Sequence, residues 1–514
     1  MSDKTMARRR PVSSYEKLFV SSSPALGTTC QWMRLTSSSV SCKKDGGSSG
    51  VSPSRPYPCT PEELVAAIHV VHRQIVPLRC ILEKEEDARS SFLSVQPDLE
   101  PVITVQKFPT DANYDGQTAS PPYLEQLASQ EVTKGMGPTP EAAYNKPLWR
   151  AIVLDDGWVM LIFHHVISDG SSRKLFVERL LESLALGRES KDADGKYTTT
   201  GQDPEISLQP GAHELLEEVM ANNTEKDDRA PLSTTTTQSE PSPPPLLAPS
   251  KPCWPSPDKV VSLIDHKYNQ APSAVIPNAS QRLRDVCRSN GVTVTSAIVA
   301  ALALAVRRQM SSADNDGNTS TTSNNTIPST EVVPMTKIGM GIDIRRHLED
   351  YQVGNDLFGC YVVGYGIEEA IPTKADDSLW TIARLVAAQM TDCTSLEFAL
   401  GKCRQMNEQM DVPMTPEVLQ GLLALIAGPD QGRTGPLNVS NIGPITSESS
   451  CGTVCVDKLF SITSQTAIGT YAFMNCATVR DDLCVTMGSV WPIVSKERGR
   501  AMLNEFVDIL IDEL

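Results

Sequence analysis

Two adjacent histidines stand at the end of an apolar run that reads V-M-L-I-F-H-H-V-I-S-D-G over residues 159–170. The chain has only seven histidines, so a pair at the edge of a hydrophobic stretch needs a structural or a chemical explanation. An imidazole near its ordinary pKa of about 6.5 can take up and return a proton at neutral pH. His164, His165 and Asp169 are therefore candidates for general acid–base chemistry.

The residues around the pair predict a strand, a turn and a helix. The run 159–163 is apolar and β-favouring, Ser168-Asp169-Gly170 is turn sequence, and the segment R-K-L-F-V-E-R-L-L that follows is amphipathic. Because adjacent residues of a strand point to opposite faces, the two histidines are expected to serve different purposes. Gly170 leaves room for a close backbone approach or for a positive φ.

A purely structural explanation of these residues is open at this point. Asp169 lies just before the expected helix, where a carboxylate caps free backbone N–H groups, and both histidines can be core residues with satisfied polar atoms. A bare H-x-x-x-D arises by chance in roughly every second chain of this length. The doubled histidine, the glycine and the strand–turn–helix context favour an imidazole presented in a cleft.

The composition limits the classes of function. The 514 residues are 40% hydrophobic and carry a formal net charge of −16, so attraction to nucleic acid or anionic lipid is not expected. Thirteen cysteines without a C-x-x-C pair or a zinc spacing, and no signal-peptide pattern, predict a reduced, cytoplasmic protein. No apolar stretch reaches the roughly 20 residues of a membrane span, which leaves only loose membrane association open. We expect a monomer and no metal.

Low-complexity sequence divides the chain into two halves. Residues 189–257 are rich in Ser, Thr and Pro and are expected to form a flexible crossover linker around one short helix at A-H-E-L-L-E-E-V-M. This linker separates an N-terminal lobe, residues 1–188, from a C-terminal lobe, residues 258–514. Each lobe combines helical patterns, one of them opened by a capping box at Thr60, with strand patterns. The expected fold class is α/β with mixed sheets.

The motif H-H-V-I-S-D-G resembles the H-H-x-x-x-D-G signature of the chloramphenicol-acetyltransferase-like, coenzyme-A-dependent acyltransferase superfamily. Order and spacing agree over most of the chain outside the linker and an Asn/Ser/Thr-rich insertion. The D-F-G-W-G of the plant branch is absent and the sequence shows no carrier-protein domain, so we expect the fungal branch rather than the plant branch or a condensation domain. The segments that resemble the fungal alcohol acetyltransferase branch are S-Y-E at 14–16, P-L-W-R at 147–150, the helical pattern at 291–303, G-I-D-I-R at 341–345 and V-S-N-I-G at 439–443.

This resemblance implies a fold and a reaction. The fold would be two chloramphenicol-acetyltransferase-like lobes, each a mixed sheet with helices, with an active-site tunnel between them. Acetyl-CoA or another acyl-CoA would be the co-substrate. The acceptor would be a hydroxyl of a small molecule, an alcohol or a secondary metabolite, that attacks the thioester directly.

The resemblance also implies roles for individual residues. His165 would be the general base, with His164 and Gly170 supporting the motif. Asp169 would turn away from the substrate and pair with an arginine. The candidates for this pair lie at the end of the strand pattern K-I-G-M-G-I-D-I-R at 337–345, first Arg345 and then its neighbour Arg346.

Four further polar residues are candidates for the site. Ser440 and Asn441 would donate hydrogen bonds to the tetrahedral intermediate, although N-I-G-P is also an ordinary exit from a strand. Gln465 and Asn355 stand in apolar surroundings and would line the channel, although such residues more often satisfy backbone groups.

Three alternatives to this reaction stay open. The acceptor can be an amine or the donor a carrier-bound acyl group, as in a condensation domain. The chain can be a non-catalytic descendant that only binds a ligand. A hydrolase is a weaker alternative, and no G-x-S-x-G pattern supports a serine nucleophile.

Overall fold

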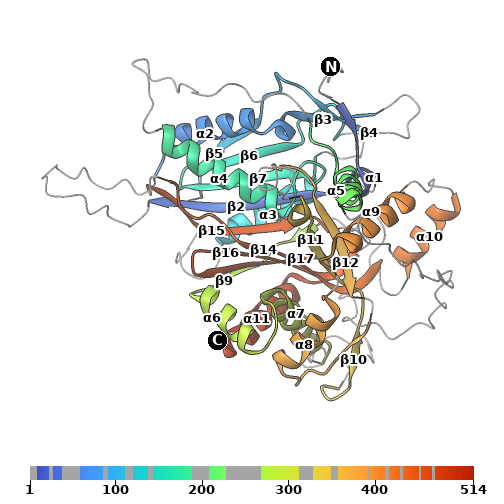
Figure 1. Ribbon diagram of the computed structural model, residues 1–514. Coiled ribbons are helices and arrows are strands. Elements are labelled where there is room, and N and C mark those ends of the chain that lie inside the picture. Colours follow the sequence, from blue (N-terminus) through green and yellow to red (C-terminus); the bar gives the residue numbers. More distant parts are fainter. Residues whose placement is uncertain are drawn as a thin grey trace, which may run out of the picture.

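The computed structural model shows two lobes stacked on each other (Figure 1). Asn355 and most of 189–257 lie outside the residues that it describes. Those residues are 9–21, 27–37, 58–84, 91–109, 120–136, 143–187, 208–226, 268–311, 328–348, 357–367, 369–391, 393–410, 416–428, 432–450, 453–465 and 469–514.

A five-stranded sheet with the order β15-β2-β7-β6-β5 forms the centre of the first lobe. Its strands pair antiparallel, except that β5 and β6 are parallel. Two helices, α2 and α4, cover one face of this sheet, and α3 lies against the other face (Figure 1). The bounds are β2 (Thr28–Ser37), β5 (Val102–Gln106), β6 (Trp149–Leu154), β7 (Trp158–His164), β15 (Val454–Thr463), α2 (Pro61–Gln74), α3 (Pro122–Lys134) and α4 (Gly170–Gly187).

One strand of this sheet comes from the second half of the chain. β15 pairs antiparallel with β2, from Val454 beside Ser37 to Thr463 beside Thr29. The same strand packs on β16 and β17 of the second lobe. Because one strand takes part in both lobes, the two halves of the chain are joined by backbone hydrogen bonds as well as by side-chain packing.

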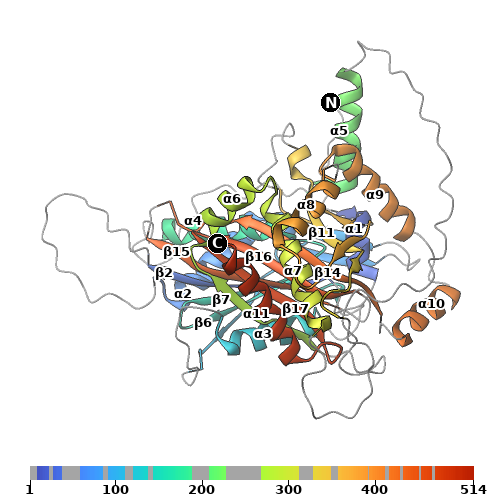
Figure 2. The same ribbon diagram turned by 90° about the horizontal axis from the view of Figure 1, so that it is seen from below.

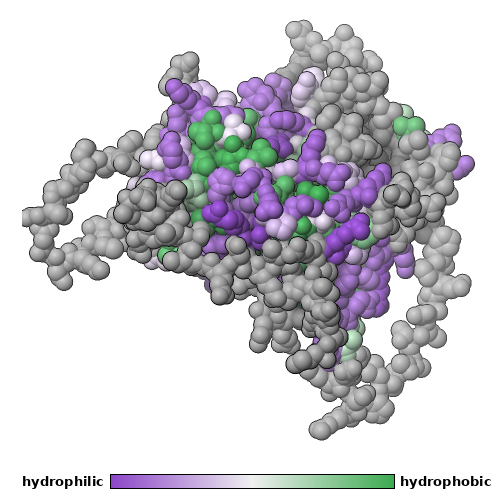
Figure 3. Space-filling view, turned by 90° about the horizontal axis from the view of Figure 1, so that it is seen from above, coloured by the Kyte–Doolittle hydropathy of each residue, from purple (hydrophilic) through white to green (hydrophobic). Residues whose placement is uncertain are grey.

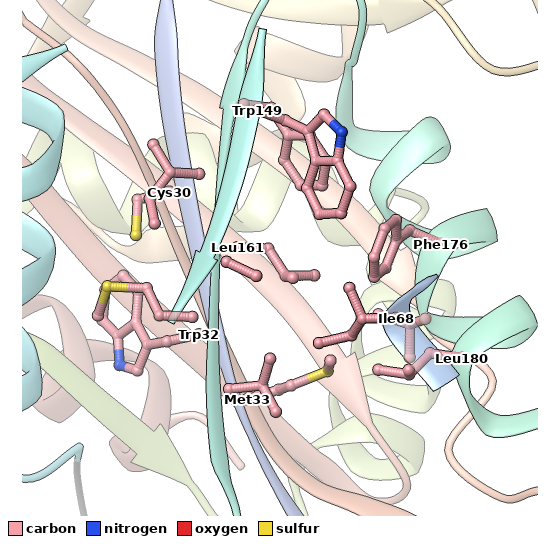
Figure 4. Close-up of a cluster of buried hydrophobic side chains, with 14 of the residues drawn as sticks. Cys30, Trp32, Met33, Ile68, Trp149, Leu161, Phe176 and Leu180 are labelled. Carbon is pink, nitrogen blue, oxygen red and sulfur yellow. The ribbon is translucent and has the colours of Figure 1, made fainter. Parts of the chain in front are cut away.

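The core of the first lobe fills the space between the sheet and its helices (Figure 4). Trp149, Phe163 and Phe176 form a buried aromatic cluster with ring centroids 5.6–5.9 Å apart. β7 is buried along its whole length, as expected for a central strand that is covered on both faces. A rigid strand therefore carries the histidine pair.

The second lobe contains a seven-stranded sheet with the order β12-β11-β14-β16-β17-β8, with β9 also paired to β17. β14 is parallel to both β11 and β16, whereas the remaining pairs are antiparallel, so the sheet is mixed as the sequence predicts. The bounds are β8 (Tyr268–Gln270), β9 (Ser273–Ile276), β11 (Ile338–Asp343), β12 (Val362–Ile367), β14 (Arg433–Pro444), β16 (Gly469–Val479) and β17 (Asp482–Trp491).

Helices cover the face of this sheet that points away from the first lobe (Figure 2). The helical pattern at 291–303 corresponds to α7, which is buried without a break from Ser296 to Arg307. No single helix in the described ranges has the length and apolar composition of a membrane span; α6 and α7 reach it only together, bent by 94°. The helices on this face are α6 (Ala279–Ser289), α7 (Val294–Ser311), α8 (Leu379–Gln389) and α11 (Lys496–Asp512).

The remaining elements are short or peripheral. Seen from above, the coloured part of the surface is mostly hydrophilic and contains one larger hydrophobic patch with smaller ones beside it (Figure 3). The small sheets have the orders β1-β4-β3 and β10-β13. These elements are β1 (Arg9–Pro11), α1 (Ser14–Ser21), η1 (Val76–Arg79), β3 (Cys80–Lys84), β4 (Ser91–Val95), α5 (Ala212–Lys226), β10 (Val333–Met335), η3 (Arg345–His347), β13 (Ile371–Thr373), α9 (Leu396–Met410) and α10 (Pro416–Ala427).

Several local predictions are confirmed. Thr60 caps α2 through a reciprocal capping box with Glu63. The short helix expected inside the crossover is α5, which packs on α9 and α1.

Candidate active site

The residues that follow β7 form a loop between the two lobes, which we call the motif loop (residues 165–169). The loop leads directly into α4. Asp169 and Ser171 form hydrogen bonds with Arg345 and Asp343, which belong to the second lobe. The strand–turn–helix unit predicted from the sequence therefore lies at the junction of the lobes.

His164 is a buried structural residue. It is 4% exposed, and its Nδ1 accepts a hydrogen bond of 3.2 Å from the backbone N–H of Val166. Its own backbone N–H donates to the carbonyl of Leu148 at 2.7 Å. Burial, followed by the neighbouring His165, lowers the pKa of His164 to about 3, so its ring is neutral and holds the turn.

His165 is half-buried at the start of the motif loop. Its backbone N–H donates to the carbonyl of Gly27, and the thiol of Cys360 lies 3.8 Å from its Nδ1. Among the described residues Nε2 has no hydrogen-bond partner, so this nitrogen is free to meet a substrate.

The pKa of His165 differs from the sequence-based expectation. Burial lowers it to about 4, and the positive charge of Arg173 acts in the same direction, while Asp169 opposes the shift. The expectation of an ordinary imidazole pKa is therefore wrong, because the sequence does not reveal the depth of the ring or the buried guanidinium beside it. At pH 7 the ring is neutral and able to accept a proton.

The carboxylate of Asp169 accepts four hydrogen bonds from other residues, and none of them comes from a histidine. Its Oδ2 accepts from Arg345 Nη1 at 2.9 Å and from the N–H of Tyr361 at 2.8 Å. Its Oδ1 accepts from Arg345 Nη2 at 3.1 Å and from the N–H of Ser172 at 2.9 Å. The Arg345 guanidinium keeps the pKa of Asp169 below its ordinary value although burial opposes this. Asp169 thus caps α4 and pairs with arginine at the same time.

Arg345, and not Arg346, reaches Asp169. Arg345 is 7% exposed and forms a two-pronged pair with the carboxylate, and its Nε donates to the carbonyl of Leu357 at 3.1 Å. Its Nη1 also donates to Asp343 at 3.0 Å. Arg346 is exposed, and within the described residues its side chain bonds only to the carbonyl of Asp343 in its own turn.

Gly170 is required by a close approach. A Cβ on Gly170 would lie 2.5 Å from Cγ2 of Ile442 on β14. The sequence suggested either a close approach or a positive φ at Gly170. The structure shows the close approach, because α4 begins directly against a strand of the other lobe.

Two residues of this network are not among the sequence-predicted site residues. Ser172 Oγ donates to the carbonyl of Gly359 at 2.8 Å and accepts from Arg345 Nη2 at 3.0 Å. Tyr361 supplies the N–H that holds Asp169, and its hydroxyl donates to the carbonyl of Pro210 in the crossover. For Ser172 the sequence offered one local indication. It lies three residues after Asp169, at the position whose backbone N–H a helix-capping side chain bonds.

Phe19 is a third residue that sequence reasoning missed. Its ring stacks on the imidazole of His165, and Gly27, with a φ of +84°, passes so close that a Cβ there would lie 2.8 Å from Phe19 Cβ. The S-Y-E segment at 14–16, singled out by its resemblance, lies in the same helix, but nothing in the sequence indicated that Phe19 contacts the histidine.

Ser440 and Asn441 point to opposite faces of β14. Asn441 turns toward α7, where its Nδ2 donates to Thr295 at 3.2 Å and its Oδ1 accepts from the N–H of Gly443. Ser440 shares the other face with Ile442, the residue that contacts Gly170. The structure therefore brings Ser440, but not the side chain of Asn441, to the side of the motif loop.

Gln465 follows β15 at the same end of the sheet as the histidines. Ser464, beside it, bonds Thr28, and Thr28 is the cross-strand partner of His164. The Gln465 amide donates to the carbonyl of Thr463 at 3.3 Å, which matches the alternative of a polar residue that satisfies backbone. Asn355 lies outside the described residues.

Comparison with known proteins gives matches among solved structures only. No family profile and no curated protein sequence matches the chain. The trichothecene 15-O-acetyltransferase TRI3 from Fusarium sporotrichioides has a TM-score of 0.61 at 13% identity, over 98% of this chain and 95% of that one. The epimerization domain from the third module of tyrocidine synthetase B has a TM-score of 0.59 at 12% identity, over 100% and 97%.

A condensation domain is also similar. The first condensation domain of the calcium-dependent antibiotic synthetase has a TM-score of 0.58 at 12% identity, over 98% of this chain and 96% of that one. Identities this low establish a common fold and leave the activity open. The chain has the two-lobed, chloramphenicol-acetyltransferase-like fold of condensation domains and related acyltransferases, as its sequence predicted.

Proposed function

We propose that this chain transfers an acetyl or short acyl group from coenzyme A to a hydroxyl of a small molecule, an alcohol or a secondary metabolite. The observation that carries the proposal is His165, a neutral imidazole at the junction of the lobes whose Nε2 has no partner among the described residues. The named acetyltransferase among the similar structures, and a starter condensation domain solved with C8-CoA and Leu-SNAC, support a thioester donor.

In this reaction His165 Nε2 takes the proton of the acceptor hydroxyl as its oxygen attacks the thioester carbonyl. The tetrahedral intermediate then collapses, the C–S bond breaks, and His165 returns the proton to the departing thiolate. No covalent acyl-enzyme is formed. Asp169 stays bound to Arg345 and holds the motif loop, and Ser440 is the candidate donor to the oxyanion.

The reaction places further requirements on the protein. Acyl-CoA and acceptor would enter a tunnel between the lobes from opposite ends and meet at His165. We propose an alcohol O-acetyltransferase of secondary metabolism that works as a cytoplasmic monomer without a metal. Transfer to an amine or from a carrier-bound donor is the alternative, because condensation domains share the fold.

The test is thiol release from acetyl-CoA by the full-length protein with panels of hydroxyl and amine acceptors. His165→Ala is expected to lower the rate at least a hundredfold without unfolding the protein, whereas His164→Ala is expected mainly to reduce stability. A His165→Ala variant that keeps most of its activity would contradict the base assignment. Thiol release without acceptor would identify a hydrolase, and no release with any acceptor would leave a ligand-binding protein.

A further inference from the structure

A row of uncharged polar side chains crosses the sheet of the second lobe. Ser440 on β14, Asn475 on β16, Thr486 on β17 and Ser273 on β9 are successive cross-strand neighbours. Side chains of paired residues lie on the same face of a sheet, with about 4.8 Å between strands. The four side chains therefore form one continuous row, which we call the polar row.

Contacts at its ends show that the polar row faces the first lobe. The backbone N–H and the hydroxyl of Ser273 both donate to Glu125 of α3 at 2.7 Å. Gly488, two residues from Thr486 on β17, would place a Cβ 3.6 Å from Ile462 of β15. The polar row thus points into the layer between the two sheets.

The central members of the polar row lack hydrogen-bond partners among the described residues. Asn475 is 2% exposed and Thr486 is fully buried, yet both amide atoms of Asn475 and the hydroxyl of Thr486 are unpaired. The fully buried hydroxyl of Thr28, on the opposite sheet, is unpaired as well. Buried polar groups are nearly always bonded, so unpaired ones that face one layer indicate that a bound molecule completes them.

The unpaired groups lie on the same faces as the candidate active site. Thr28 is the cross-strand partner of His164 and shares its face of the first sheet. On the second sheet, Ile442 follows Ser440 on the same face and meets Gly170 at the end of the motif loop. A molecule that fills the layer beside the polar row is therefore a neighbour of the motif loop.

We propose that the polar row and Thr28 bind the acceptor, and that the acceptor is a neutral molecule with an apolar carbon skeleton and at least two oxygen functions besides the reacting hydroxyl. An amide and two hydroxyls offer both donors and acceptors but no charge, which suits hydroxyl, carbonyl or ether oxygens. Ile442 and Ile462 beside them suit a hydrocarbon skeleton. This assignment rests on the proposed function. A plain alkyl alcohol would leave the buried groups unpaired, and sites built to bond an oxygen discriminate strongly against analogues that lack it.

The test measures binding and transfer separately on the full-length protein. The probes are two matched pairs: menthol with a triol of the same p-menthane skeleton, and a steroid mono-ol with the triol of the same skeleton. Calorimetry gives the affinity for each probe, and thiol release from acetyl-CoA gives transfer. The variants are Asn475→Leu and Thr486→Val, which keep the number and branching of the side-chain heavy atoms and remove the unpaired polar atoms. Thr29→Val is the matched control, because its hydroxyl is also buried and unpaired but lies on the opposite face of β2 from Thr28, beside Phe163.

The more oxygenated member of at least one pair is expected to bind at least tenfold more tightly to the native protein. Asn475→Leu and Thr486→Val should each remove most of this preference, by roughly tenfold, while the melting temperature stays equal or rises because an unpaired buried group is lost. Thr29→Val should keep the preference. Equal affinity within both pairs, a preference that survives both variants, or an equal loss in Thr29→Val would overturn the assignment. A binding preference without thiol release would overturn the proposed function and leave the ligand class standing.

Discussion

The imidazole of His165 lies flat against the ring of Phe19, with centroids 4.1 Å apart and 5° between the ring planes. Phe19 belongs to α1, at the opposite end of the first lobe's sequence from the motif. A stacked ring limits the rotation of the imidazole and keeps water from one of its faces. The helix at the start of the chain therefore takes part in setting the orientation and the pKa of the candidate base.

The first prediction concerns the pH dependence of transfer. Because the pKa of His165 is lowered to about 4, kcat/KM should stay constant from pH 7 to about pH 5 and fall only near pH 4. Rates of thiol release across this range give the measurement, with acetyl-CoA at low concentration. An acidic limb centred near pH 6.5 would contradict the depressed pKa.

Stability should depend on pH through the same groups. Unfolded histidine binds a proton near pH 6.5, whereas His164 and His165 in the folded protein bind one only near pH 3 and pH 4. The unfolded state therefore gains protons first, and the free energy of unfolding should fall as the pH drops from 6.5 toward 4, by up to about 1.4 kcal/mol per pH unit for each residue. Urea unfolding at pH 7, 6 and 5 measures the slope, which His165→Ala should reduce.

The second prediction concerns the stacked ring. Phe19→Ala should lower kcat about tenfold, because the imidazole is no longer held in one orientation, and should move the acidic limb toward pH 6.5, because the ring becomes more hydrated. Phe19→Tyr keeps the aromatic ring and should restore both. If Phe19→Ala and Phe19→Tyr were equally impaired, or if Phe19→Ala left the acidic limb in place, the stacking would have no role in positioning.

The third prediction concerns the buried ion pair. Asp169→Asn keeps the shape of the side chain but leaves Arg345 with only the more exposed carboxylate of Asp343, which should cost about 3 kcal/mol of stability. Arg345→Lys, which changes the other member of the pair, should also lower the stability. Its ammonium group cannot bond both carboxylate oxygens and the Leu357 carbonyl at the same time. Arg346→Ala is the control and should change the free energy of unfolding by less than about 0.5 kcal/mol. If urea unfolding showed that Asp169→Asn changes the free energy of unfolding as little as Arg346→Ala does, this account would be contradicted.

The fourth prediction concerns the junction between α4 and β14. Gly170→Ala should push the motif loop away from Ile442, costing about 1–3 kcal/mol and much of the transfer activity. A second substitution, Ile442→Ala, should recover part of both losses by removing the clashing methyl group. Gly401→Ala on α9 is the control, because a Cβ there meets nothing within 4 Å. Failure of Ile442→Ala to recover anything would show that the clash is not the cause.

Much of the local structure is predictable from the sequence. The capping box at Thr60 and the apolar run that ends at His164 depend on residues a few positions apart, and the structure contains both α2 and β7. The histidine pair predicted two different environments, and the structure shows a buried His164 and a half-buried His165. Strand alternation also applies to Ser440 and Asn441, but which of them faces the first lobe depends on the sheet to which β14 belongs.

The sequence by itself determined the fold class and the motif, because periodicity, caps and turn residues act through neighbours along the chain. Only the tertiary structure decided that Arg345 meets Asp169 across 176 positions, that β15 completes the sheet of the other lobe, and that Phe19 covers His165. Such contacts depend on how whole elements pack, and no local pattern specifies the partner. The low pKa of His165 follows from the same packing, because the burial of the ring, which is its largest cause, arises only in the tertiary structure.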